Sequence, residues 1–164
     1  MKRSVDTHIR NLGALVANLQ TLEFYLRAVL SELPGSAPCG LAPGQNIYDL
    51  TVGDELACCP MTDFDTLREL IKKYNRVAVV RGWHQVDTSL VEIRDALAHG
   101  RIAYPTDDHQ YAHLMKFSKP DEEGKVYMTF NDEMSTEWFE KHIKRTAAAH
   151  QAVSDASHQL HASD

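Results

Sequence analysis

A leucine-rich seam near the N-terminus constrains the fold of this chain more than any other feature. Between residues 6 and 33, apolar side chains recur in alternating steps of three and four. They are Leu12, Leu15, Leu19, Leu22, Leu26, Val29 and Leu33. A seven-residue apolar repeat of this length predicts a long helix that packs in a helical bundle or against a helix of a second subunit. Pro34 and Gly35 then end the helix.

Two shorter helices are predicted in the middle of the chain. Thr62, with Asp65 three residues later, resembles a capping box and predicts the start of the second helix. The buried face of that helix would consist of Phe64, Leu67, Ile71, Tyr74 and Ala78. Gly82 predicts a break before the third helix, and we expect Gly100 to end the third helix in a left-handed conformation. The third helix would bury Val86, Leu90, Ile93 and Leu97.

The last predicted helix begins near Ser135, where Met134 and Phe139 can form a hydrophobic staple. Its inner face would be Ile143, Thr146, His150, Val153 and Leu160. His150 therefore belongs to the packed face. The other histidines of this helix, which we expect to face solvent, are His142, His158 and His161.

Two regions interrupt the helices. Residues 34–61 are rich in glycine and proline and predict an insertion, with either a short element around residues 46–56 or a flap. Residues 111–117 and 125–131 favour strands and predict a β-hairpin, within an extended segment covering residues 102–131. Because a lone hairpin is marginally stable, we expect it to pack on the helices, with residues 102–104 as a candidate third strand.

The predicted fold class is all-α: an up-and-down bundle of about four helices with a small β-hairpin insertion before the last helix. The 164 residues are expected to form a single domain, 43% of them apolar and 24% charged. No segment approaches the roughly 20 apolar residues of a membrane span, and the N-terminus is unlike a signal peptide. We therefore expect a cytoplasmic protein without a membrane partner.

Cysteine and histidine spacing gives no sign of a metal site. The cysteines are Cys39, Cys58 and Cys59, an odd number with two adjacent, so a disulfide framework is not expected. Paired spacings typical of zinc ligands are missing from the sequence, and the eight-residue spacing of the late histidines drifts around a helix by about 80° per step. No metal or other cofactor is expected. Cys58 as a nucleophile is a minor alternative.

The formal charge of −6 argues against a broad nucleic-acid-binding surface but leaves room for a small basic cleft. Basic and imidazole side chains gather in the middle third of the chain. They are Arg76, Arg81, His84, Arg94, His99 and Arg101. Without a motif beside it, such a cluster is most simply a solvated helix face.

The motif within this cluster is Arg94-Asp95-Ala96-Leu97-Ala98-His99. Arginine and histidine both suit phosphate chemistry, and here they stand at the foot of a predicted helix. At about 100° per residue, Arg94 and His99 point roughly 140° apart. A site that uses both side chains therefore needs a frayed helix end or a second copy of the chain.

The motif resembles the signature of the HEPN superfamily, small helical domains of prokaryotic toxins, defence proteins and RNA-processing enzymes. That signature is an arginine, then a polar residue, then a histidine after four to six intervening positions. Asp95 matches the polar residue, and four positions separate Arg94 from His99. The long first helix and two central helices agree with the bundle of that family. The hairpin and the insertion at residues 34–61 do not belong to its minimal fold.

The resemblance implies a metal-independent endoribonuclease that acts as a homodimer and leaves a 2′,3′-cyclic phosphate. His99 would move protons at the ribose 2′-hydroxyl or the leaving 5′-oxygen, and Arg94 would clamp the phosphate. Asp95 would orient His99 or an arginine of the second subunit. Candidate substrate-binding residues are Arg81, His84 and Arg101.

The partners implied by the resemblance are RNA or a nucleotide, and a cognate antitoxin or a nucleotidyltransferase-type protein. An alternative function belongs to another class: a non-catalytic HEPN-like helical module that binds a nucleotide or a protein partner. The acidic composition favours this alternative, whereas the intact arginine, polar residue and histidine favour the ribonuclease.

Overall fold

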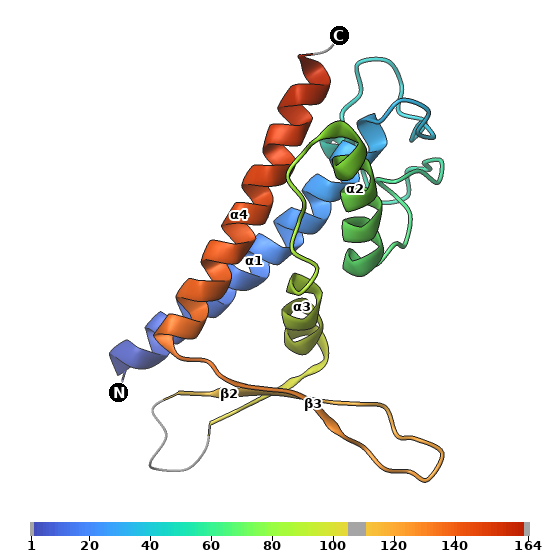
Figure 1. Cartoon of the computed structure of the whole chain (residues 1–164). Coiled ribbons are helices and arrows are strands. Elements are labelled where there is room, and N and C mark those ends of the chain that lie inside the picture. Colours follow the sequence, from blue (N-terminus) through green and yellow to red (C-terminus); the bar gives the residue numbers. More distant parts are fainter. Residues whose placement is uncertain (1, 105–110, 163–164) are drawn as a thin grey trace. The chain divides into compact units, whose positions relative to one another are not determined.

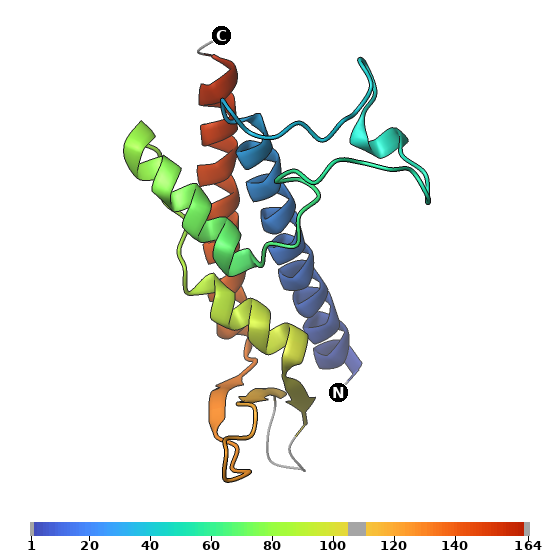
Figure 2. The ribbon, with the colours of Figure 1, turned by 90° about the vertical axis from the view of Figure 1, so that its right-hand side faces the viewer.

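The computed structural model describes residues 2–104 and 111–162, and it is mainly helical, as the sequence predicts (Figures 1 and 2). The α-helices of this part of the chain are α1 (Lys2–Glu32), α2 (Leu67–Arg81), α3 (Leu90–His99) and α4 (Thr136–His161). The strands are β1 (Arg101–Ala103), β2 (His113–Phe117) and β3 (Met128–Glu133). None of these helices combines the length and apolar character that a membrane span requires.

The described residues form two compact units. The first contains the described residues of 1–20 and 87–148, and the second contains those of 21–86 and 149–164. Helices α1 and α4 each contribute a segment to both units, whereas α2 lies in the second unit and α3 in the first.

The predicted hairpin is part of a three-stranded antiparallel sheet in the first unit, with strand order β1-β2-β3. His113 lies opposite Glu133 between β2 and β3, and Arg101 lies opposite Met115 between β1 and β2. The third strand thus forms one residue earlier than the predicted segment, and it supplies backbone partners to the second edge of β2. Residues 105–110 of the predicted extended segment lie outside the described residues.

The core of the first unit joins its helical segments to the sheet. Buried side chains from α1, α3, β2 and the start of α4 pack together in one cluster. Its members are Leu15, Leu19, Ile93, Ala96, Ala112, Leu114, Met134, Trp138 and Phe139. The predicted start of the last helix is confirmed, because the Ser135 side chain accepts a hydrogen bond from the Trp138 amide at 3.2 Å.

His142 is buried in the first unit, so its expected exposure is wrong. Its ring lies 4.5 Å from the ring of Trp138, and its Nδ1 lies 3.0 Å from Arg145 Nη1. Arg145 also donates to Asp87 at 2.7 Å and contacts Ser89. Burial, with a smaller contribution from Arg145, lowers the pKa of His142 from 6.5 to about 4.

The N-cap of helix α2, in the second unit, lies four residues later than predicted. The capping box is Thr66 with Glu69, while Thr62 instead accepts from the Cys59 amide at 3.0 Å and donates to the Ala57 carbonyl at 2.8 Å. Phe64 therefore precedes the helix and is fully exposed rather than buried. The predicted break at Gly82 is confirmed, because Gly82 has a φ of +71° and caps α2 in the left-handed conformation.

The third helix also starts later than expected. Residues after Gly82 form an irregular segment, and α3 begins only at Leu90. Within the second unit, the Asn75 side chain pairs with both the amide and the carbonyl of Val86 at 2.8 Å each. Val86 is buried as predicted, but these two bonds hold it in an irregular segment rather than in a helix.

A disulfide joins Cys39 to Cys59, so the expectation from the odd cysteine count that no disulfide forms is wrong. It lies in the insertion between α1 and α2, which also contains the short 3-10 helix η1 (Ile47–Asp49) (Figure 2). Cys58 is the remaining thiol and is exposed. Because disulfides are rare in reducing compartments, this pairing is unusual for the expected cytoplasmic location.

The Cys39–Cys59 bond closes a loop between residues 20 positions apart, so it restricts the unfolded chain. We expect Cys39→Ser to lower the free energy of unfolding by roughly 3 kcal/mol under oxidising conditions. Denaturant titration measures this change. Cys58→Ser is the matched control and should unfold like the unsubstituted chain, while equal stability of all three proteins would contradict a formed disulfide.

The buried His142 predicts acid-sensitive folding. The unfolded chain takes up a proton below about pH 6.5, whereas the folded chain does so only near pH 4, because its pKa is lowered by burial. Stability should therefore fall as the pH drops from 6.5 to 4, by an amount of order 3 kcal/mol. The change is followed by thermal unfolding at successive pH values.

His142→Gln should flatten this pH dependence, while the exposed His161→Gln should leave it in place. The neighbouring Asp87 acts in a separate window, since the hydrogen bond from Arg145 lowers its pKa from 3.8 to about 2. An unchanged slope between pH 6.5 and 4 in His142→Gln would show that another group is responsible.

Candidate functional site

The Arg94–His99 motif occupies the C-terminal part of α3 in the first unit, directly before the sheet (Figure 2). His99 is the last residue of the helix, and β1 begins at Arg101. The Gly100 amide donates to the Ala96 carbonyl at 2.7 Å, which closes the helix. A single residue therefore separates the end of the helix from the first strand.

Gly100 does not take the left-handed conformation that the sequence suggests. Its φ of −83° and ψ of −174° are extended, and any residue can adopt them. Glycine is required at position 100 because a side chain would not fit. A Cβ atom would lie 2.3 Å from the Ala96 carbonyl oxygen and 2.8 Å from the Met115 carbonyl oxygen. The end of α3 can approach β2 this closely only because residue 100 lacks a side chain.

Asp95 lies between two cations at the surface of this unit. Its Oδ1 is 3.4 Å from Arg94 Nη1, and its Oδ2 is 3.9 Å from Lys116 Nζ. About a third of each side chain is exposed, so these pairs contribute little to stability. They instead leave two positive groups around one carboxylate, an arrangement that can attract an anionic phosphate.

Lys116 is a further candidate residue of this site, and no pattern in the sequence predicts it. It lies on β2, opposite Phe130 of β3, and approaches Asp95 of α3 through the packing of β2 against that helix. No spacing in the sequence relates Lys116 to the motif, since 20 residues lie between it and Asp95 and a strand pairing fixes its place. Its place follows from the register of the sheet.

His99 and Arg101 lie on either side of Gly100 and are both exposed. Within the described residues, the His99 side chain makes no hydrogen bond or ion pair. The Arg101 guanidinium lies 5.2 Å from the centre of the Phe117 ring, which orients it along the sheet. The imidazole at the end of the helix is therefore open to a ligand.

Helix α3 is regular from Leu90 to His99, so the divergence expected between Arg94 and His99 holds. Their side chains leave the helix roughly 140° apart. Arg94 contacts Asp95, and His99 joins none of the contacts of that pair. Within one chain, Arg94 and His99 therefore lie on two different faces of α3.

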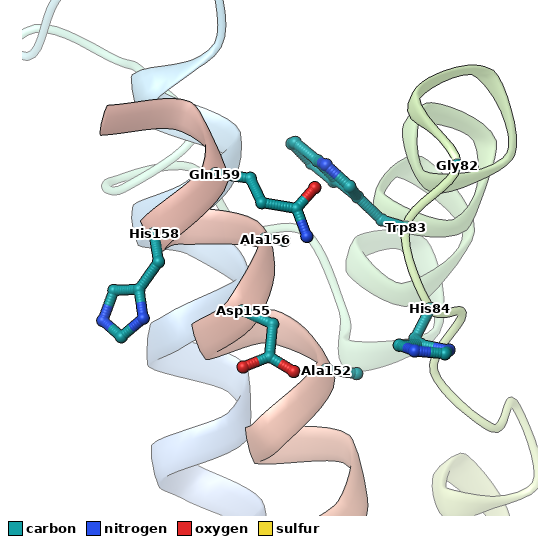
Figure 3. A pocket seen from close by; sticks show the side chains of 8 residues that line it. All are labelled: Gly82, Trp83, His84, Ala152, Asp155, Ala156, His158 and Gln159. Atoms are coloured by element: carbon teal, nitrogen blue, oxygen red, sulfur yellow. The ribbon is translucent and has the colours of Figure 1, made fainter. Parts of the chain in front are cut away.

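Arg81 and His84 belong to the second unit, so Arg101 is the expected substrate-binding residue that shares a unit with the motif. The Arg81 guanidinium lies 5.3 Å from the centre of the Trp83 ring. The His84 carbonyl lies 3.1 Å from the Tyr74 hydroxyl, which can donate to it. His84 also lines a cavity of that unit, together with Trp83 (Figure 3).

The described residues contain no group of three or more histidine, cysteine, aspartate or glutamate side chains placed to hold a metal ion. No protein-family model, curated protein or solved structure matches this chain. The resemblance to HEPN domains accordingly rests on the motif and its helical setting.

Gly100→Ala should destabilise the first unit by roughly 2–3 kcal/mol, because the added methyl group overlaps the carbonyl oxygens of Ala96 and Met115. Denaturant unfolding measures the loss. Gly13→Ala provides the control. Gly13 lies within α1, and a Cβ atom added there would have no neighbouring atom within 4 Å.

Gly13→Ala should raise stability by up to about 1 kcal/mol, because alanine has the higher helix propensity. Opposite signs for the two substitutions would support the steric role of Gly100. A Gly100→Ala chain as stable as the unsubstituted one would contradict it.

Proposed function

We propose that the chain is a metal-independent endoribonuclease of the HEPN type that acts as a homodimer. One observation carries this proposal: the exposed His99 imidazole ends α3 in the same unit as a set of surface cations. Those cations are Arg94, Arg101 and Lys116. Histidine can both accept and donate a proton near neutral pH, and cations beside it can stabilise a pentacovalent phosphate.

The proposed reaction needs no co-reactant besides RNA. His99 accepts the proton of the ribose 2′-hydroxyl, and the 2′-oxygen attacks the adjacent phosphorus. The bond from phosphorus to the 5′-oxygen breaks, and this oxygen takes up the proton that His99 accepted, directly or through water. The products are a 2′,3′-cyclic phosphate and a 5′-hydroxyl.

Arg94 is assigned to the phosphate, with Asp95 as its positioning residue. The resemblance suggests that Asp95 orients His99 or an arginine of the second subunit, but the contacts of Asp95 favour Arg94 and Lys116. A carboxylate 3.4 Å from the guanidinium limits the rotamers of Arg94 while leaving donors for a phosphate. Lys116 adds a second cation on the same face.

A two-fold axis near the end of α3 would bring together the Arg94 and His99 side chains, which point apart within one chain. Arg94 and His99 diverge by roughly 140°, so one subunit cannot direct both at the same phosphate without unwinding its helix. Two copies related by symmetry would bring two arginines and two histidines to one cleft. This geometric need is the main support for the homodimer.

The partners in this proposal come from the same resemblance, whereas the helix arrangement and the location come from the sequence patterns. We infer an up-and-down arrangement of the four helices, action on RNA in the cytoplasm, and control by an antitoxin or nucleotidyltransferase-type partner. The alternative remains a non-catalytic module that binds a nucleotide or protein. The net charge of −6 favours it, because RNA is repelled by an acidic surface outside a basic cleft.

The purified chain should cleave single-stranded RNA in the presence of EDTA and leave 2′,3′-cyclic phosphate ends, which mass spectrometry identifies. His99→Ala and Arg94→Ala should each lower the cleavage rate by roughly 100-fold or more, because they remove the proton-transfer group and the phosphate clamp. His161→Ala, at an exposed histidine in the other unit, is the control and should retain full activity.

Mixing the two inactive variants tests the shared cleft. A mixed dimer keeps one Arg94 and one His99, so part of the activity should return on subunit exchange. Failure to recover activity would contradict a composite site. Equal cleavage by every variant would indicate a contaminating nuclease, and RNA binding without cleavage would favour the non-catalytic module.

A further inference from the structure

The exposed side of helix α2 in the second unit carries a row of cations (α2 is labelled in Figure 1). This helix has five basic side chains and one acidic one, although the whole chain has a formal charge of −6. Three of the basic residues follow one another at steps of four positions, namely Arg68, Lys72 and Arg76. We call these three residues the α2 stripe.

All three side chains of the α2 stripe are exposed. Within the part of the chain that the structure describes, none of them makes a hydrogen bond, an ion pair or a ring contact. The neighbouring Lys73 differs, because it pairs with Asp65 and lies 3.8 Å from Asp63. The α2 stripe therefore offers two guanidinium groups and one ammonium group whose donors are open to a ligand.

The one acidic residue of α2 does not pair with the stripe. The Glu69 carboxylate accepts hydrogen bonds from the Thr66 amide at 2.7 Å and from the Thr66 hydroxyl at 2.8 Å. These bonds belong to the capping box and hold the carboxylate at the N-terminal end of the helix. An anionic ligand on the stripe would therefore meet cations to which no carboxylate is bound.

The stability of the helix does not explain the α2 stripe. Like charges four residues apart on a helix repel each other, and the helix dipole disfavours a cation in the first turn, where Arg68 lies. Solubility does not require these cations either, since the chain already has a net charge of −6. An anionic ligand would relieve the repulsion among the three side chains.

The spacing of the α2 stripe suits a ligand with negative charges at regular intervals. Four residues advance roughly 6 Å along a helix and turn by roughly 40°, so the stripe follows a gently winding path roughly 12 Å long. The phosphates along a nucleic-acid strand carry one negative charge each at a comparable separation. Arg68 and Arg76 can each bind two oxygens of a phosphate, and Lys72 adds a point charge between them.

An acidic protein surface fits the α2 stripe less well. Protein–protein interfaces usually have an apolar or aromatic centre, and they are depleted in lysine. Between Arg68 and Arg76, no apolar side chain is exposed. The exposed Val79 and Val80 come only in the last turn of α2. The stripe thus has the charge of a phosphate-binding surface without the apolar centre of a protein interface.

We propose that the α2 stripe binds the phosphate backbone of a single-stranded nucleic acid. Its three cations contact three successive phosphates, and release of the counterions of those phosphates drives the association. Because phosphates carry no sequence information, base sequence and the 2′ position of the sugar have little influence on binding. The stripe belongs to the second unit and the Arg94–His99 motif to the first, and this inference does not depend on the ribonuclease activity.

Fluorescence anisotropy of the full chain with a labelled dodecamer of 2′-O-methyluridine tests the proposal. This probe has no free 2′-hydroxyl and cannot be cleaved by the proposed reaction, so binding is measured separately from catalysis. The triple variant Arg68→Gln, Lys72→Gln and Arg76→Gln should bind roughly tenfold or more weakly at low salt. Its plot of log K against log salt should be shallower by about 2, because each phosphate contact contributes about 0.7 in single strands.

The triple variant Lys119→Gln, Lys141→Gln and Lys144→Gln is the matched control, since it removes the same charge from exposed positions of the first unit. It should keep the affinity of the unsubstituted chain. Denaturant unfolding should show the stripe variant to be at least as stable as that chain, because the substitutions remove repulsion. A thymidine dodecamer should bind as tightly as the uridine probe.

Unchanged binding by the stripe variant, or an equal loss in both triple variants, would overturn the proposal. Much weaker binding of the thymidine dodecamer would also overturn it, because the sugar would then be recognised. Polyglutamate that displaces the probe as effectively as an unlabelled oligonucleotide of equal charge would instead indicate an acidic protein partner.

Discussion

The close approach of Gly100 to its neighbours determines how the first unit is assembled. Gly100 lies against the carbonyl oxygens of Ala96 on α3 and Met115 on β2, in a space that no side chain could share. This contact ends the helix and starts β1 one residue later, so the sheet packs directly on α3. The exposed His99, the ion pair of Asp95 with Lys116 and the position of Arg101 all follow from that junction.

In the second unit, buried or partly buried polar side chains hold the segments before and after α2 in place. Arg27 donates to the carbonyl of Asp63 at 3.0 Å and that of Asp65 at 2.6 Å, and it pairs with the Asp63 carboxylate. These bonds hold the end of the insertion at the start of α2. Tyr74 and Asn75 similarly fix the segment after α2, which forms one wall of the cavity. Such contacts satisfy backbone groups that would otherwise be buried without partners.

The two units carry different chemistry, although their basic residues form one cluster in the sequence. Arg94, His99 and Arg101 lie in the first unit, whereas Arg81 and His84 line or flank the cavity of the second. Proximity in the sequence misled here because the segment after Gly82 is irregular rather than helical. Asp155 and Gln159, from the far end of the chain, complete that cavity, and no local motif connects them with Trp83.

The sequence by itself determined where most helical segments lie, because apolar periodicity and capping residues such as Ser135 and Gly82 act over a few neighbouring residues. It also placed the three strands to within a few residues. The tertiary structure alone decided the capping of α2 by Thr66, the burial of His142, the Cys39–Cys59 bond and the steric need for Gly100. Each of these depends on atoms brought together from distant or competing parts of the chain, and local sequence preferences do not encode such distances.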